Sequence, residues 1–150
     1  MAVRKIPPYY PVGFSFLVKV TGISGSYEGS FQEVTGINAK LDTIPLIEGG
    51  ENRFVRRLPN PPKYDNLVLK RGMILSSELI DWARDAVEKF TFKTKTVTVS
   101  LIDEERNPMA TWSFAAAYPV ALKISEFKAQ DNSLVCESLE LAYESFQRTL

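Results

Sequence analysis

The chain has 150 residues and a formal net charge of zero; 45% of the residues are hydrophobic and 24% are charged. This length and composition predict a single globular domain, residues 1–150, and exclude a globally disordered chain. With no histidine and one cysteine, Cys136, the sequence excludes a Ser-His-Asp triad, an internal disulfide and a paired-cysteine metal site. We therefore expect no enzymatic activity, no metal and no cofactor, and we expect Cys136 to be a small core residue.

The N-terminal segment predicts no targeting signal. Residues 1–12, MAVRKIPPYYPV, combine charges with prolines and tyrosines instead of a long apolar run, so we expect an irregular N-terminal arm. No apolar run anywhere in the sequence reaches the roughly 18 residues of a membrane span. We expect synthesis and assembly in the bacterial cytoplasm, without a membrane anchor.

The first half of the chain is typical of β-strands. Residues 13–20, GFSFLVKV, alternate apolar and polar side chains with the period of two that a strand requires. A glycine- and serine-rich turn follows, and residues 31–37 predict a second strand. Residues 40–47 predict a third strand, which Pro45 places toward a sheet edge. Residues 66–73 predict a further strand.

One segment predicts a helix, residues 77–90, SELIDWARDAVEKF. Ser76 or Ser77 can cap its N-terminus, and carboxylates in the first turns suit the helix dipole. Apolar residues recur at helical spacing and form one face, which we expect to cover a sheet. They are Leu79, Trp82, Ala83, Ala86, Val87 and Phe90.

The second half returns to strands. KTKTVTVSLID alternates strictly, EERNP predicts a hairpin turn, and MATWSFAAAYP and VALKISEF predict two further strands. LVCESLELAYESF predicts the closing strand. The fold class is therefore mainly β (α+β), an antiparallel β-sandwich or partly closed barrel of about seven or eight strands with one flanking α-helix.

Carboxylates cluster at residues 103–105 and along the closing strand, at Glu137, Glu140 and Glu144. A catalytic pair requires burial and a shifted pKa, and a turn or an alternating strand predicts neither. We interpret these groups as solvated surface. No phosphate-binding glycine motif occurs, because the paired glycines 49–50 precede neither a lysine nor a helix.

The stretch from Leu46 to Met73, LIEGGENRFVRRLPNPPKYDNLVLKRGM, is basic and rich in proline. Between residues 51 and 71 it holds six cations and two anions, so a neutral chain must carry the matching anions elsewhere, largely in the helix and the closing strand. Such segregated charge favours head-to-tail association of identical copies. Two alternatives stay open: a solvated loop, and a small nucleic-acid- or ligand-binding β-barrel that uses the basic patch from Arg53 to Arg71.

Taken in order, YYPVGFSFLVKV, FQEVTGI, EGGEN, RLPNPPKYDNLVLKRGM, LIDWARDAV, VTVSLIDEERNPMATWSFAAAYPV and SLELAYESF resemble the tail-tube proteins of contractile phage tails and phage-tail-like injection systems. The resemblance covers nearly the whole chain. Its most specific parts are KYDNLVLKRG and SLELAYESF. The family's usual LPG turn is replaced here by LPNPP, residues 58–62, which leaves open whether the chain is the main tube subunit or a first-ring subunit at the baseplate.

The resemblance implies a structural function. Family members form hexameric rings that stack into a hollow inner tube, which a contractile sheath drives through a target envelope. The implied partners are other copies of the chain, sheath subunits, baseplate and spike proteins, and a cargo of DNA or effector protein in the lumen.

Residues 48–65 correspond to the family's extended inter-subunit loop, and the neighbouring strand supplies two further candidates. The implied assembly residues are Glu48, Gly49, Gly50, Glu51, Asn52, Arg53, Arg56, Arg57, Lys63, Tyr64, Lys70 and Arg71.

Overall fold

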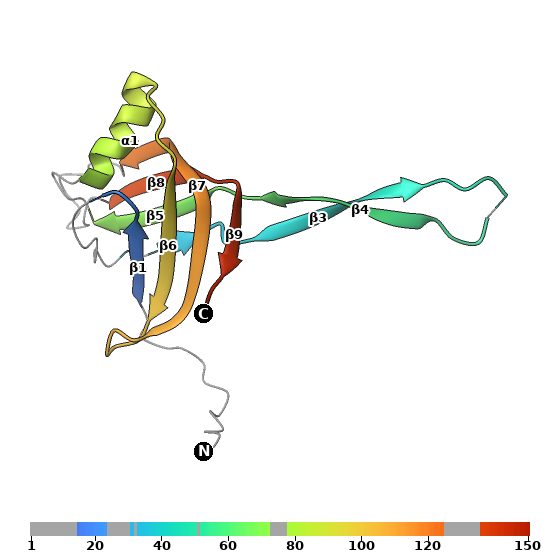
Figure 1. The fold of residues 1–150 in the computed structure, drawn as a ribbon, viewed down its shortest axis with the longest axis horizontal. Coiled ribbons are helices and arrows are strands. Elements are labelled where there is room, and N and C mark those ends of the chain that lie inside the picture. The colour runs from blue at the N-terminus through green and yellow to red at the C-terminus, as the bar shows by residue number, and fades with distance from the viewer. Residues whose placement is uncertain (1–14, 24–30, 32, 51, 73–77, 125–135) are drawn as a thin grey trace, which may run out of the picture.

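The computed structural model describes residues 15–23, 31, 33–50, 52–72, 78–124 and 136–150. The predicted N-terminal arm, the serine caps of the helix, the glycine- and serine-rich turn, Glu51 and Met73 lie outside these residues. The described part forms nine strands and one helix, and every strand pair is antiparallel. A body built from one curved sheet carries a long hairpin that projects to one side (Figure 1).

The sheet of the body confirms the mainly β prediction. Its strand order is β1 (Ser15–Val20), β6 (Lys95–Ile102), β7 (Pro108–Ile124), β8 (Cys136–Ala142), β5 (Leu67–Gly72) and β2 (Glu33–Thr35), and β9 (Ser145–Arg148) pairs with β7. A single bridge joins Phe16 of β1 to Phe31, just before β2. The strands at the two ends of the sheet order, β1 and β2, therefore approach each other, and the sheet forms a partly closed barrel.

The core lies on the inner face of this sheet, because buried residues alternate with more exposed ones along β5, β6 and β8. Val97 and Val99 of β6 are fully buried, as are Leu67 of β5 and Leu141 of β8. Phe114 of β7 is also fully buried, and its ring lies 4.9 Å from that of Tyr143 and 5.4 Å from that of Phe146. Burying side chains of this size is worth about 1.5–3 kcal/mol each, so this layer holds the barrel together.

Helix α1 (Glu78–Lys89) covers the barrel at β7, as predicted. Leu79, Trp82, Ala83 and Ala86 are buried. The Trp82 indole N–H donates to the Lys93 carbonyl at 2.8 Å. The same pattern predicted burial for Val87 and Phe90, and this is wrong: Val87, near the end of the helix, is 50% exposed, and Phe90, which follows its last residue, is 83% exposed.

Two strand boundaries in the second half differ from the prediction. β7 is one strand of 17 residues, where two were expected. Ala116, with a φ of 51°, lies at a register shift against β6, and this bulge bends the strand without ending it. The closing segment is two strands, β8 and β9, which lie along the same edge of β7. The Glu144 N–H donates to the Ala115 carbonyl at 3.0 Å and keeps both on that edge.

The projecting hairpin consists of β3 (Ala39–Leu46) and β4 (Arg56–Tyr64), which form a separate two-stranded sheet (Figure 1). The prediction of an extended loop over residues 48–65 is therefore corrected: only residues 47–55 connect the strands. Proline lacks the N–H that a central strand donates to a neighbour. Because β4 has a single partner strand, Pro59, Pro61 and Pro62 are tolerated within it.

Among the described residues, no helical segment has the length and hydropathy of a membrane span.

Candidate assembly interface

The hairpin, residues 39–64, exposes large apolar side chains over most of its length. Ile47 is 88% exposed and Val55 is 61% exposed, and both belong to the tip, residues 47–55. The full set is Leu41, Ile44, Leu46, Ile47, Phe54, Val55 and Leu58. Isolated surface apolar residues are common, but seven exposed apolar side chains on one projecting hairpin are typical of a protein interaction site.

Aromatic rings anchor the hairpin to the body at its base. The Tyr64 ring lies 5.7 Å from the ring of Tyr143 and 5.5 Å from that of Phe146. The Tyr143 hydroxyl donates to the Gly36 carbonyl at 3.4 Å, where the chain passes from β2 to β3. Burial, with smaller contributions from Asp65 and Tyr64, raises the pKa of Tyr143 to about 12. The base is thus fixed to the barrel, and only the outer part of the hairpin lacks support.

The charges of the hairpin are paired locally. Arg56 Nε lies 3.7 Å from a Glu48 carboxylate oxygen, and Lys63 forms an ion pair with Asp42 on the opposite strand. On the neighbouring strands of the body, Lys70 Nζ lies 3.6 Å from a carboxylate oxygen of Glu33. The carboxylates that pair with these three cations lie outside residues 51–71, but on the hairpin and strand β2 instead of the helix and the closing strand.

Arg57 differs from its neighbours in that no ion pair joins it to another described residue. It is exposed on β4, directly opposite Pro45 in the register. Of the cations proposed for assembly, it is the one whose charge is most available to a second molecule.

Arg71 does not belong to a surface patch. It is 4% exposed, and its Nε lies 3.5 Å from a carboxylate oxygen of Glu137, which is 6% exposed and directly opposite in the register. Its guanidinium carbon lies 5.4 Å from the centre of the Phe31 ring. The prediction of surface positions for Arg71 and Glu137 is wrong. Residues 67, 69 and 71 share one face of β5, so strand periodicity could have placed Arg71 inside.

The structure divides the predicted assembly residues among three places. The tip holds Glu48, Gly49, Gly50, Asn52 and Arg53; strand β4 holds Arg56, Arg57, Lys63 and Tyr64; strand β5 of the body holds Lys70 and Arg71. The charge-based prediction missed the exposed apolar residues. Their signal was available, because leucine, isoleucine, phenylalanine and valine flank the glycines on both sides.

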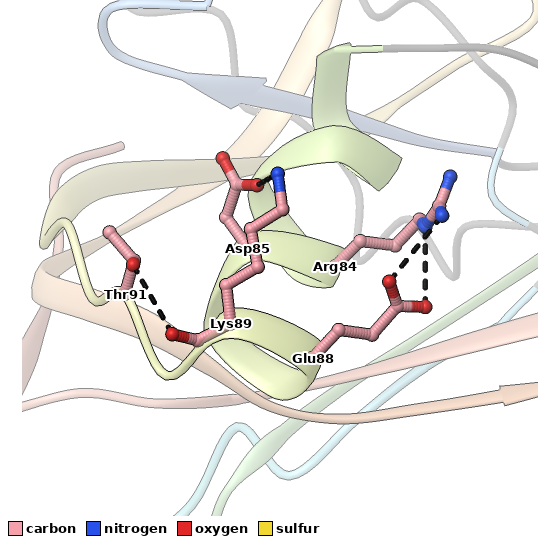
Figure 2. Close-up of polar contacts among 5 residues, drawn as sticks. All are labelled: Arg84, Asp85, Glu88, Lys89 and Thr91. Carbon is pink, nitrogen blue, oxygen red and sulfur yellow. Dashed lines mark hydrogen bonds and ion pairs between the residues drawn. The ribbon is translucent and has the colours of Figure 1, made fainter.

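The outer face of α1 carries paired charges. Figure 2 shows Arg84 donating from Nε and Nη2 to the two carboxylate oxygens of Glu88, each at 3.4 Å, and Lys89 Nζ 3.2 Å from Asp85. The Thr91 hydroxyl donates to the Lys89 carbonyl at 3.4 Å. Such exposed pairs, four residues apart, modestly support the helix. Within the described ranges, no three metal-ligating side chains lie together.

The ion pair between Asp42 and Lys63 makes a testable prediction. A hydrogen bond and charge attraction hold the Asp42 pKa below 3.8 and the Lys63 pKa above 10.5. The stabilisation from Asp42 is therefore present above pH 3.8 and lost as pH falls through its lowered pKa. That from Lys63 is present below pH 10.5 and lost as pH rises through its raised pKa.

We expect NMR titration of the Asp42 carboxyl carbon to give a midpoint below 3.8. The variant Lys63→Met should bring that midpoint back toward the ordinary value. A midpoint at or above 3.8 in the unmodified protein would mean that the pair does not form in solution.

The described residues thus form a partly closed barrel with one covering helix and a projecting hairpin that exposes apolar side chains. The family model described as T4-like virus tail tube protein gp19 matches residues 12–147, so the chain belongs to the tail tube family and is a structural tube subunit of contractile injection systems. This confirms the resemblance seen in the sequence. Comparison with curated proteins finds no match.

Solved structures share the fold. A chain of the anti-feeding prophage baseplate is 25% identical, with a TM-score of 0.80 and 95% of each chain covered. A chain of the sheath–tube complex of the extracellular contractile injection system PVC, in its extended state, is 24% identical; the TM-score is 0.79 and the coverage 96% of this chain and 93% of the other. Hcp1 from Salmonella typhimurium is 12% identical, with a TM-score of 0.60 and 91% and 86% covered.

Proposed function

We propose that the chain forms hexameric rings that stack into the inner tube of a phage tail or phage-tail-like particle, and that the hairpin makes contacts between subunits. Sheath subunits would surround the tube, baseplate and spike proteins would meet its end, and DNA or effector protein would pass through its lumen. Membership of the tail tube family and the similarity to chains of a baseplate and of a sheath–tube complex support this proposal.

The observation that carries the proposal is the unsupported hairpin. An isolated two-stranded ribbon is marginally stable in water, and a lasting one requires further strands or packing against another surface. The aromatic contacts of Tyr64 fix only the base, while the apolar side chains of the outer part face solvent. A neighbouring subunit would supply the missing packing.

A nucleic-acid-binding function is less well supported. Binding to DNA depends on cations that are available to phosphates, and Arg56, Lys63, Lys70 and Arg71 each have a carboxylate partner. The alternative predicts strong, salt-dependent binding to DNA, whereas the proposed function predicts none beyond the weak attraction of exposed cations such as Arg57.

The test of the proposed function removes one apolar pair from the hairpin. Ile44 and Leu58 lie directly opposite each other and are 48% and 47% exposed. The double variant Ile44→Thr with Leu58→Thr keeps residues that suit a strand, so the subunit should fold with nearly unchanged stability. We expect the double variant to form no tubes in negative-stain electron microscopy, or to need at least about tenfold more protein to form them. A tenfold change corresponds to a loss of about 1.4 kcal/mol in the free energy of association.

Leu150→Thr is the matched control, because Leu150 is 55% exposed and follows β9, a strand of the body that pairs with β7. It should assemble like the unmodified protein. Normal tubes from the double variant would show that these hairpin residues are not part of an interface.

A further inference from the structure

An apolar groove lies on the body between the end of α1 and strand β7. Its volume is about 280 Å³, and Ala86, Val87, Phe90, Phe92, Pro119 and Val120 line it together with Tyr118. Val87 is 50% exposed and Val120 is 40% exposed. The ring of Phe92 lies 4.8 Å from that of Phe90 and 5.7 Å from that of Tyr118, so three aromatic rings form one wall. This volume is enough for one or two large aliphatic or aromatic side chains.

Phe90 is an outlier in this wall. It follows the last residue of α1 with a φ of 53°, a left-handed conformation that glycine adopts easily and that a bulky side chain avoids. Its side chain is nevertheless 83% exposed, so the chain itself offers little burial in return. Residues with strained backbone conformations concentrate at binding sites, where the strain is part of how the site works.

We propose that this groove receives the hairpin tip of a second copy of the chain, with Ile47, Phe54 or Val55 inserted against the aromatic wall. The inference rests on the proposed function and names the surface that the hairpin contacts. The chain thus carries both a protruding apolar tip and an apolar groove. The tip cannot reach its own groove, because the hairpin projects from the body away from α1 (Figure 1).

The charges beside the two surfaces are complementary. Helix α1 carries four carboxylates and two cations, which leaves a net charge of −2. Residues 48–57 of the hairpin carry three arginines and two glutamates, which leaves +1, and Arg57 has no ion pair within the described ranges. Opposite charge around an apolar contact favours association of the tip with α1 over association of two tips.

A contact between different surfaces of identical copies does not end at a dimer. Each subunit offers one tip and one groove, so each can bind one neighbour on either side, and the result is a ring or an open filament. A symmetric dimer would stop at two subunits, whereas the proposed contact links three or more. The size of crosslinked species therefore distinguishes the two.

Disulfide crosslinking of assembled protein tests the contact. In a Cys136→Ser background, cysteines are placed at Ile47 and Val87, and separately at Val55 and Val120. A disulfide forms only where the two Cα atoms come within roughly 7 Å. We expect at least one pair to give a ladder of trimers and larger species on non-reducing gels, at least about tenfold above each single-cysteine variant.

The control pair places cysteines at Leu150 and Val87, both exposed, and should give no ladder. Tubes without a ladder from either test pair would overturn the docking and leave the proposed function standing. Absence of both tubes and ladders would overturn both. Crosslinks between Val87 and an added sheath protein, without a ladder, would assign the groove to that protein and overturn the proposal.

Phe90→Gly tests the groove independently of crosslinking. Glycine relieves the left-handed strain, so the isolated subunit should keep or raise its melting temperature. The same change removes one of the three aromatic rings of the groove wall, so the protein concentration needed for tube formation should rise at least about tenfold. If Phe90 only stabilises the subunit, Phe90→Gly should lower the melting temperature. If Phe90→Gly forms tubes at the same protein concentration as the unmodified protein, the proposed docking is contradicted.

Discussion

Replacing Arg71 with methionine should lower the free energy of unfolding by about 3–5 kcal/mol. Arg71 and Glu137 are opposite residues of β5 and β8, 4% and 6% exposed, within an otherwise apolar layer. Removing the guanidinium leaves the Glu137 carboxylate buried without its countercharge. One carboxylate oxygen, Oε2, has no hydrogen bond among the described residues, so it depends on the nearby cation. Chemical denaturation monitored by tryptophan fluorescence measures the effect.

The double variant Arg71→Met with Glu137→Met separates burial of charge from packing. Two apolar side chains of similar length avoid the cost of moving both charges out of water, so we expect stability within about 1 kcal/mol of the unmodified protein, or above it by up to about 4 kcal/mol. A single variant that costs less than about 1 kcal/mol would show that water reaches this pair in solution.

Replacing Gly36 with alanine should destabilise the protein by at least about 2 kcal/mol, since two effects add. The φ of Gly36 is 92°, which L-residues rarely adopt. A Cβ atom built there would also lie 1.9 Å from the Asn66 carbonyl oxygen, which belongs to backbone and cannot rotate away. Gly36 lies where the chain leaves the body for the hairpin, so the same change should also displace the hairpin base.

Two other glycines are matched controls for this change. Gly50 has the same φ of 92° but nothing within 4 Å of its Cβ position, and Gly49 has neither constraint. Alanine at Gly49 should change stability by less than about 0.5 kcal/mol, and alanine at Gly50 by about 1 kcal/mol. Equal effects at Gly36 and Gly50 would show that the contact with Asn66 is relieved by a small backbone movement.

Much of the barrel could be predicted from the sequence because its strands alternate. Residues 95–102 alternate valines with threonines, and the helix shows one apolar face, so both elements follow from local periodicity. Burial of Arg71 follows the same rule, since it shares a strand face with Leu67 and Leu69. It was missed because a charged side chain is usually assigned to the surface.

Other features depend on contacts that no local pattern specifies. β4 contains three prolines and becomes a strand because β3 pairs with only one of its edges. The burial pattern of α1 failed at Val87 and Phe90, because periodicity along a helix does not tell how far the covered sheet extends. The candidate site could be located in the sequence, but it was interpreted from its arginines, and its exposed apolar residues were missed.

Electron microscopy of the purified, unmodified protein is the sharpest test of the proposal that the subunits assemble through the hairpin. That proposal predicts hollow rings and tubes with sixfold symmetry, and a reconstruction in which each hairpin is covered by a neighbouring subunit. A protein that stays monomeric at high concentration, and that also fails to enter particles formed with sheath and baseplate proteins, would contradict it. So would tubes in which the hairpin tips face solvent.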